Sequence, residues 1–578
     1  MTPASLRRLA VAAIASAGAI ALAIGPAGAS ASGKDKKDEL IPIRILSIND
    51  LHGNLEPPTG SSGRIADETG TIVDGAGGAA YLATYVKQQR NRDTVLVAAG
   101  DLIGASPLLS AAFHDEPTVA FLDSLELATS SAGNHEFDEG ITELKRVMEG
   151  KCHPVDGCSV PGKKWKGTDF EFIAANVTDT KKNKPALSPY YVERINGEKV
   201  AFIGLVTKTT PTIVTASGIA GLDFTDEVAA ANETSEYLRE VKGIKAQVVL
   251  VHEGDQVTPN QSPDACPITK GPGSRIAEGV DPEIDLIISG HSHQAYICKA
   301  TDPAGQQRVY TQGSSFGRVL TQIDFNIDKE TGDIVRSSVV ADNTVVRRTV
   351  TPDPATVSFI NDWKARVATV ANKKVGDITA DITNVAVPSG ESPLGNLIAD
   401  SQLESAKTGG NAEIALMNPG GIRTTLTYAS SPAGEGPGVT TYGEIFAVQP
   451  FNNLVQVVTL TGAQLKLVLE QQWVGGPNNQ AFTKILQPSS NFTYSYSNSA
   501  AWGSKVSNIK IDGVPVTPTQ SIRVAANNFL VGGGDAFLAF TQGTGLWSGP
   551  LDIDAFEAYL TANSPVAPPV ANHITVLP

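Results

Sequence analysis

The first residues able to do chemistry lie in a short polar loop after an apolar run. Residues 41–57, IPIRILSINDLHGNLEP, begin with strand-like residues and become polar at Asn49. In an extended chain, alternation places Asp50 and His52 on the same side. A carboxylate oxygen and an imidazole nitrogen at this spacing can coordinate one divalent ion. Alone the pattern is weak, and a polar loop without a ligand explains it more simply.

Four further stretches have the same form. GDLIGASP, GNHEFDEG, VHEGD and GHSHQ each follow a strand-like run, and with the first loop they hold five of the eight histidines. A lone histidine is usually a core or surface residue, but five at strand ends in one domain indicate a shared metal site. The candidate residues are Asp50, His52, Asp101, Asn134, His135, Asp138, His252, His291 and His293.

The charges favour a pair of ions and a phosphate substrate. Asp50 and Asp101 bring about two negative charges and two divalent ions about four positive, so the site attracts phosphate although the chain carries −15 overall. Two ions ~3.5–4 Å apart can hold a hydroxide and clamp an in-line displacement. One carboxylate must bridge them, and Asp101 lies between the other loops in sequence. The mixed His, Asp and Asn ligands suit zinc, manganese, iron or cobalt.

The elements that must position these loops alternate along the chain. Strand-like runs occupy 44–48, 94–99, 171–175, 200–205, 247–251 and 284–289, with helical stretches such as 78–91 and 141–150 between them. Continuous apolar strands alternating with helices indicate a layered α/β domain with buried sheets. Active sites of such sheets gather at the carboxyl ends of the strands.

The chain is too long for one core, and its composition divides it. We expect a catalytic domain at 40–345 and a linker with one helix at 346–374, where Asp353 caps and Pro354 begins the helix. A second domain at 375–563 is richer in Gly, Pro, Thr and Val, with helices at 394–407 and 463–473. The tail, 564–578, is expected to be a loosely held extension.

The termini and cysteines predict export. Residues 1–31 are typical of a signal peptide, with Arg7 and Arg8, an apolar core and AGASA at 27–31. A membrane anchor is the alternative, but the apolar run is short. We expect a secreted or cell-envelope protein with no membrane span in its mature form. The acidic charge argues against nucleic acid as a partner.

Four cysteines in an exported chain suggest two disulfides. Proximity favours Cys152–Cys158 and Cys266–Cys298, although three pairings are possible. A zinc site built from cysteines is the alternative, and the spacings fit it poorly.

The motif order DxH, GDxxGxSP, GNHEFD, H and GHSH resembles the calcineurin-type metallophosphoesterases. With the second domain, residues 41 to about 560 resemble the secreted 5′-nucleotidase family. The resemblance implies a layered β-sandwich metallophosphoesterase domain flanked by helices, followed by an α+β substrate-binding domain. It implies that Asp50, His52, Asp101 and His293 hold one metal and Asp101, Asn134, His252 and His291 the other. It also implies that His135 contacts the phosphoryl group or leaving oxygen while Asp138 orients its ring.

Three stretches of the second domain match the nucleotide pocket of that family. They are NPGGIR (418–423), FAVQPFNN (446–453) and NFLVGGGDAF (528–537). Each alone is more simply a turn or a core aromatic. By resemblance, Phe451 and Phe529 sandwich the base and Asp535 binds ribose hydroxyls. The pocket is completed by Asn418, Gly420, Gly421, Arg423 and Asn453.

One departure bears on substrate. Family members often carry another arginine shortly before the GNL helix, whereas VAVPSGESPLGNL (385–397) has none and Pro388 lies near that place. How tightly the protein binds its substrate, and which substrate it uses, therefore stay open.

The sequence predicts an exported hydrolase that releases phosphate from nucleotides by attack of a metal-bound hydroxide. The alternatives with the same site are a 2′,3′-cyclic-nucleotide phosphodiesterase and a nucleotide-sugar pyrophosphatase. An alternative of another class is an inactive secreted nucleotide-binding protein.

Overall fold

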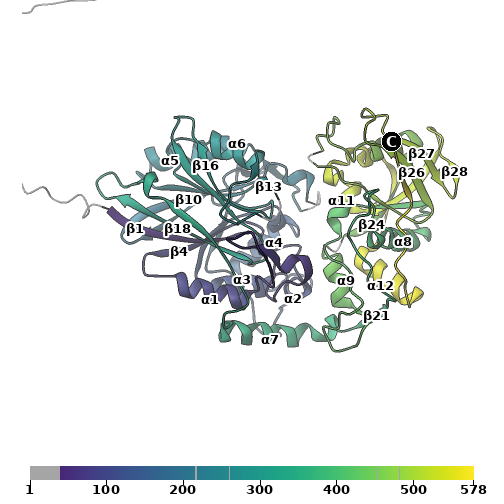
Figure 1. Cartoon of the computed structure of the whole chain (residues 1–578), viewed down its shortest axis with the longest axis horizontal. Coiled ribbons are helices and arrows are strands. Elements are labelled where there is room, and N and C mark those ends of the chain that lie inside the picture. Colours follow the sequence, from purple (N-terminus) through teal and green to yellow (C-terminus); the bar gives the residue numbers. More distant parts are fainter. Residues whose placement is uncertain (1–39, 215–217, 259–260, 452, 481) are drawn as a thin grey trace, which may run out of the picture.

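The chain folds into two domains joined by a long helix (Figure 1). The computed structural model describes residues 40–214, 218–258, 261–451, 453–480 and 482–578, so the predicted signal peptide lies outside the described residues. Across the described ranges, no helix combines the length and apolar character needed to cross a membrane.

The first domain is built on two stacked sheets. One runs in the order β19-β18-β1-β4-β5-β6, with β20 also paired to β18, and the other runs β16-β17-β15-β12-β10-β9. The strands of the first sheet are β1 (Leu40–Ile48), β4 (Thr94–Ala99), β5 (Leu127–Ser131), β6 (Glu171–Ile173), β18 (Val319–Asp328), β19 (Asp333–Ile334) and β20 (Val340–Val345). Those of the second are β9 (Tyr190–Ile195), β10 (Glu198–Val206), β12 (Gln247–His252), β15 (Leu286–Ser289), β16 (Ala295–Thr301) and β17 (Gln307–Gly313).

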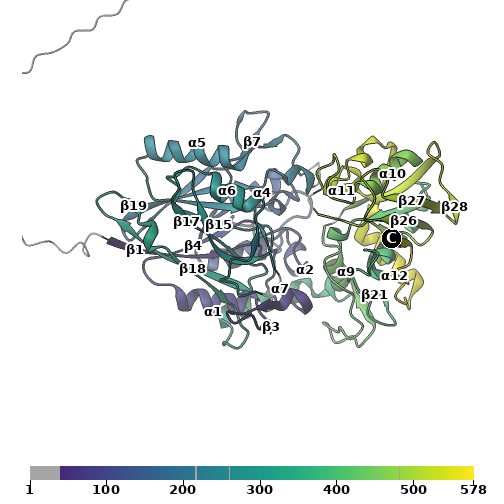
Figure 2. The ribbon, with the colours of Figure 1, turned by 45° about the horizontal axis from the view of Figure 1, so that its top comes forward.

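Strand alternation divides the apolar side chains between two layers. Ile43 and Ile45 of β1 share a buried cluster with Val248 and Leu250 of β12, so the two sheets pack face to face. Ile48 belongs instead to the cluster that includes α1 (Ala79–Gln89). Helices α5 (Glu227–Glu240) and α6 (Pro272–Gly279) cover the outer face of the second sheet (Figure 2). This helix–sheet–sheet–helix sandwich matches the predicted fold class.

Parallel pairing brings the polar loops to one edge. Strands β1, β4, β5 and β6 run parallel to one another, and so do β10, β12, β15 and β17. Each predicted strand run is a strand, and each predicted ligand loop follows the carboxyl end of one. The antiparallel strands β16, β18, β19 and β20 were not predicted, because their polar–apolar alternation lacks the continuous apolar signal of the central strands.

The linker contains the predicted helix, α7 (Pro354–Ala371). Asp353 caps it by accepting from the Thr356 amide, and Trp363 is buried on its inner face. The helix contacts α1 and α2 (Leu108–Ala111) of the first domain and α9 (Tyr442–Val448) of the second. It therefore ties the two domains together along one side of the molecule (Figure 1).

The second domain packs helices on a mixed sheet ordered β25-β22-β29-β24-β30, beside a smaller sheet ordered β28-β27-β26-β31. The strands of these two sheets are β22 (Ile414–Met417), β24 (Leu454–Thr461), β25 (Gln487–Pro488), β26 (Phe492–Ser497), β27 (Val506–Ile511), β28 (Val514–Pro515), β29 (Ser521–Asn527), β30 (Thr544–Leu551) and β31 (Ile574–Leu577). A further pair, β21 (Lys374–Asp377) and β23 (Val439–Thr441), forms a small separate sheet. The helices include the two predicted, α8 (Pro393–Lys407) and α10 (Gly462–Glu470), together with α11 (Asn528–Val531) and α12 (Asp552–Asn563).

The expectation of a loosely held tail is wrong. Strand β31 pairs in parallel with β26, and Ile574 is buried against the second domain's core. The tail forms the edge strand of a sheet, and a Pro-rich sequence gives no local signal for that strand.

Both predicted disulfides are present, Cys152–Cys158 and Cys266–Cys298, with sequence separations of 6 and 32 residues. In the chain-entropy description, a longer closed loop restricts the unfolded chain more. The Cys266–Cys298 bridge should therefore stabilise the fold by roughly 1.5 kcal/mol more than Cys152–Cys158. Urea unfolding of the C266S/C298S and C152S/C158S variants measures the difference. Equal losses of unfolding free energy would contradict this expectation.

Candidate metal centre and active site

The ligand loops adopt an unusual backbone. Asp50, His52, Asp101, His291 and His293 have φ values of 50°, 47°, 48°, 72° and 60°. Left-handed conformations cost free energy at non-glycine residues and are characteristic of functional sites. The prediction that Asp50 and His52 share a side through strand alternation was therefore wrong in its reason, because β1 ends at Ile48. A tight turn brings the two side chains together instead.

One ligand group contains Asp50, His52 and His293. The Nε2 atoms of His52 and His293 lie 3.2 Å apart, and His293 Nε2 is 3.3 Å from Asp50 Oδ1. His52 Nδ1 lies 2.9 Å from the carbonyl of Gly104, which fixes that nitrogen as the donor and leaves Nε2 free as a ligand. The Asp50 carboxylate accepts from the His291 amide at 3.0 Å.

A second group contains Asp101, His252 and His291. His252 Nδ1 lies 2.8 Å from the carbonyl of Ala99, and its Nε2 lies 2.9 Å from Asp101 Oδ2. Beside them, the buried Asn134 Oδ1 has no hydrogen-bond partner among the described residues. A buried acceptor without a partner is costly, and a cation at this place would satisfy it.

Asp101 stands between the two groups. Its Oδ2 atom lies 2.9 Å from His252 Nε2 and 3.6 Å from His52 Nε2. Its Oδ1 atom accepts from the backbone amide of His135 at 2.9 Å. One oxygen thus faces both groups while the other is held, which is the arrangement a bridging carboxylate needs.

The protonation states of three candidate ligands suit metal binding, and a fourth must change. Burial lowers the pKa of His52 and that of His291 to about 3, so both rings are neutral at ordinary pH. For Asp101, burial opposes ionisation, but the neighbouring histidines outweigh it and lower the carboxyl pKa well below its usual range. Neutral imidazoles and ionised carboxylates are the forms that bind divalent transition metals. Burial lowers the pKa of His252, but Asp101 outweighs it and raises that pKa to about 10, so this ring must release a proton to bind an ion.

His135 lies between the metal ligands and the second domain. It belongs to the short helix η3 (His135–Phe137), and its Nδ1 is 2.8 Å from Asp138 Oδ2. Its ring centroid lies 5.1 Å from that of His52 and 5.9 Å from that of Phe451. Burial lowers the pKa of His135, but Asp138 and Asp101 outweigh it and raise that pKa to about 9. The ring can therefore carry a proton at neutral pH.

The second domain turns Arg423 and Phe451 toward this ring. The Arg423 guanidinium lies 5.8 Å from the Phe451 ring centroid. Burial lowers the pKa of Arg423, while the negative charges of Asp101 and Asp138 across the domain boundary oppose that shift. Phe451 and Phe529 are both only partly buried, unlike the core phenylalanines of the domain.

The remaining predicted pocket residues divide into two sets. Asp535 is buried, accepts from Asn418 Nδ2 at 3.0 Å and is paired with Lys484, a cation the sequence analysis missed. Gly420 lies beside Asp535, and a Cβ there would make an ordinary contact with Asp535 Oδ2 at 3.7 Å. Gly421 is buried against Met417. Asn453 is also buried and bonds Asp552, so its side chain supports the sheet rather than lining open space.

The segment without the family's arginine is exposed at Val385, Ala386 and Pro388 and turns inward from Ser389. Glu391 is fully buried and lies 3.1 Å from His573 Nδ1 while accepting from the Ile574 amide at 3.0 Å. This carboxylate holds the tail, which gives the segment a structural role.

Sequence reasoning also missed Glu136. Its buried carboxylate accepts from the amides of Asp101 at 3.0 Å, Leu102 at 2.8 Å and Gly133 at 2.5 Å. It therefore ties the Asp101 loop to the Asn134 loop. Burial raises the pKa of Glu136 to about 7. The acidic residue was visible inside GNHEFDEG, but only the folded loops show which amides it meets.

Comparisons with known proteins agree with this geometry. The calcineurin-like phosphoesterase family matches residues 43–295, and the 5′-nucleotidase C-terminal domain family matches residues 367–542. The cell wall protein Lmo0130 of Listeria monocytogenes is 34% identical over 550 residues, covering 90% of this chain and 67% of that protein. Endonuclease YhcR of Bacillus subtilis is 31% identical over 542 residues, covering 92% of this chain but only 40% of its own length.

A solved structure shares the fold. The 5′-nucleotidase precursor from Thermus thermophilus superposes with a TM-score of 0.73 at 24% identity, covering 93% of this chain and 99% of that one. The sandwich and its ligand loops define a calcineurin-like metallophosphoesterase domain. Together with the second domain, they show that the chain belongs to the 5′-nucleotidase family.

Glu136 provides a test of how the loops are held. Replacing it by glutamine, E136Q, exchanges an acceptor oxygen for a donor and leaves buried amides of the Asp101 and Gly133 loops unpaired. Unfolding free energy should fall by about 2–3 kcal/mol, and bound metal should fall with it. Denaturation and elemental analysis measure both. An E149Q variant on α4 (Ile141–Glu149) is the matched control, and an E136Q protein indistinguishable from it would contradict the role.

Proposed function

We propose that the protein is an exported dinuclear-metal phosphohydrolase that releases phosphate from nucleotides. The observation that carries this is Asp101 Oδ2 between two ligand groups, with His135 placed between that centre and Phe451. The ligands would be Asp50, His52, Asp101, Asn134, His252, His291 and His293. Two divalent ions, when bound, supply positive charge and activate a water for in-line displacement.

The chain's own residues divide the remaining work. His135 donates a proton in a hydrogen bond to a phosphoryl oxygen or the leaving oxygen, while Asp138 holds the opposite ring nitrogen at 2.8 Å. Arg423 binds the phosphate from the side of the second domain. Phe451 and Phe529 hold the base between them, and Asp535 accepts from ribose hydroxyls. These assignments keep the reaction and the recognition in different domains.

Diester cleavage with the same site is the second candidate. It is favoured by the relative named as an endonuclease, and by the absence of the additional arginine from residues 385–397. The prediction that nucleic acid is not a partner therefore stays a prediction. Export of the protein also stays a prediction, and it is supported by the relative named as a cell wall protein and by the two disulfides.

The test is phosphate release from AMP, ADP, UDP-glucose, 2′,3′-cyclic AMP and a small aryl phosphate, with and without a chelator. Chelator-sensitive release from AMP supports the proposal. Preference for the cyclic or sugar nucleotide favours the second candidate. Binding of nucleotides without turnover at any metal tried would identify a binding protein.

The base clamp is tested by replacing both rings, F451A/F529A. Each stacking face contributes ~1–3 kcal/mol, so kcat/KM for AMP should fall at least tenfold. Turnover of a small aryl phosphate at saturation should change little, because that substrate has no base. A melting curve controls for unfolding. Equal loss on both substrates would assign the rings to the core.

Asp138 is tested through the pH profile. Its charge raises the pKa of His135, so protonated His135 persists to high pH and activity is lost as pH rises through that pKa. In D138N the raising charge is gone, and the alkaline limb of kcat/KM should move to lower pH by roughly 1–3 units. An unmoved limb at unchanged metal content would exclude His135 as the titrating acid.

A further inference from the structure

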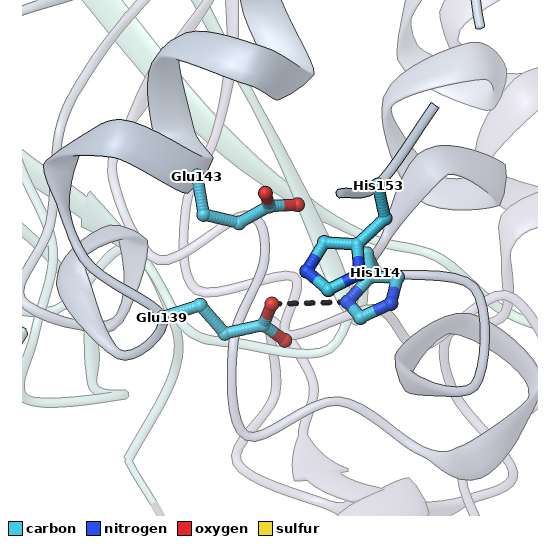
Figure 3. A group of neighbouring side chains, drawn as sticks. All are labelled: His114, Glu139, Glu143 and His153. Atoms are coloured by element: carbon cyan, nitrogen blue, oxygen red, sulfur yellow. Dashed lines mark hydrogen bonds and ion pairs between the residues drawn. The ribbon is translucent and has the colours of Figure 1, made fainter. Parts of the chain in front are cut away.

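A second cluster of metal-ligating side chains lies outside the site already described. His114 lies between α2 and α3 (Glu116–Ser124), and His153 lies in the Cys152–Cys158 loop. Glu139 precedes α4, and Glu143 lies in the first turn of that helix. One nitrogen or oxygen from each lies within 4.8 Å of all the others. Figure 3 shows the two rings and two carboxylates converging from these separate segments.

We infer that His114, Glu139, Glu143 and His153 form a further binding site for one zinc-type divalent ion. Two imidazoles beside two carboxylates are borderline ligands, which favour zinc over calcium or magnesium. Tetrahedral zinc at ~2.0–2.2 Å from its ligands separates them by roughly 3.4 Å, a separation that four atoms within 4.8 Å of one another can reach by small side-chain rotations. His114 Nδ1 already lies 3.0 Å from Glu139 Oε2.

Asp156 supplies the outer support that such sites use. Its Oδ2 lies 3.0 Å from His114 Nε2 and 3.1 Å from His153 Nδ1. A carboxylate that accepts a proton from His114 Nε2 leaves His114 Nδ1 as a ligand. His153 Nδ1 accepts from the Asp156 backbone amide at 3.1 Å, so the neutral His153 ring carries its proton on Nε2 and must give it up there to bind an ion. The two rings are stacked, with centroids 3.8 Å apart and planes 19° from parallel. Two charged imidazolium rings would repel each other in this position, so neutral rings suit it better.

Charge and exposure are compatible with an ion. Glu139 is half exposed, whereas the two histidine side chains are mostly covered, so the cluster opens to solvent on one side. Arg146 lies 2.8 Å from one Glu143 oxygen and 2.9 Å from the other, which orients this carboxylate. A carboxylate has about four acceptor positions, so Glu143 keeps capacity for an ion.

The competing explanation is a proton in place of the ion. Burial lowers the pKa of His114, but Glu139 and its acidic neighbours outweigh it and raise that pKa. A protonated His114 would bond Glu139 and Asp156 and need no metal. Proton and metal compete for the same lone pair, so metal content measured above neutral pH separates them.

The ion would fasten segments that support the catalytic centre. Asp115, next to His114, accepts from the Gly104 amide at 3.1 Å, and the Gly104 carbonyl lies 2.9 Å from His52 Nδ1. Glu139 directly follows Asp138, the partner of His135. The cluster itself touches neither His135 nor the Asp101 ligands in these contacts, so its role is to hold positions.

The test counts ions in the full chain. Protein equilibrated with zinc above neutral pH and passed through a metal-free column should contain one more equivalent by elemental analysis than the H114Q/H153Q variant. The matched control is H573Q, which removes a histidine paired at 3.1 Å with Glu391 outside both clusters and should keep the wild-type content. D156N should retain the ligands but bind the ion about 10–100-fold more weakly.

Equal zinc content in wild type and H114Q/H153Q would overturn the inference. If that variant fails to fold, E139Q at the half-exposed position takes its place, and unchanged zinc content and affinity there overturn the inference equally. Because the readout is stoichiometry rather than turnover, the outcome is independent of the proposed function. Catalytically silent protein with three bound ions would support this site while contradicting that function.

Discussion

The structure depends on one buried carboxylate, Asp101, being held where two ligand groups meet. Contacts with neighbouring residues fix the position of the Asp101 side chain. A Cβ on Gly133 would lie 2.2 Å from Asp101 Oδ1, so that loop can approach only as glycine. Glu136 gathers the amides of both loops, and the His135 amide holds the second oxygen of Asp101. Left-handed turns at five ligand residues complete a centre whose strain is sustained by the two buried sheets beneath it.

An acidic protein that attracts phosphate must concentrate positive charge locally. Here the cations available at the domain junction are the ions that the ligand groups can bind and the side chain of Arg423. The His135 and Phe451 ring centroids lie 5.9 Å apart across the domain boundary. In the proposed division of work, recognition by the second domain would contribute to catalysis only while α7 and the domain interface hold these two rings in place.

Histidines are concentrated where they can bind ions. Seven of the eight lie in two clusters, one at the strand ends and one fastened to the small disulfide loop. The second cluster joins segments that the first depends on, through Asp115, Gly104 and His52. A covalent bridge and a set of metal-ligating side chains thus act on the same region.

The sequence by itself determined most of the central strands, several of the helices and the polar loops that gather at the strand ends, because apolar periodicity and polar loops are local signals. It also favoured the two cysteine pairs that the structure contains, because the partners are near in sequence. Only the tertiary structure decided the pairing of β1 with β18, the strand formed by the tail, and the turns that unite Asp50 with His52. It likewise decided that Glu136 holds two loops, that Asn453 faces Asp552, and that His114 meets His153. These depend on contacts between residues far apart in the chain or on backbone angles that no periodicity records.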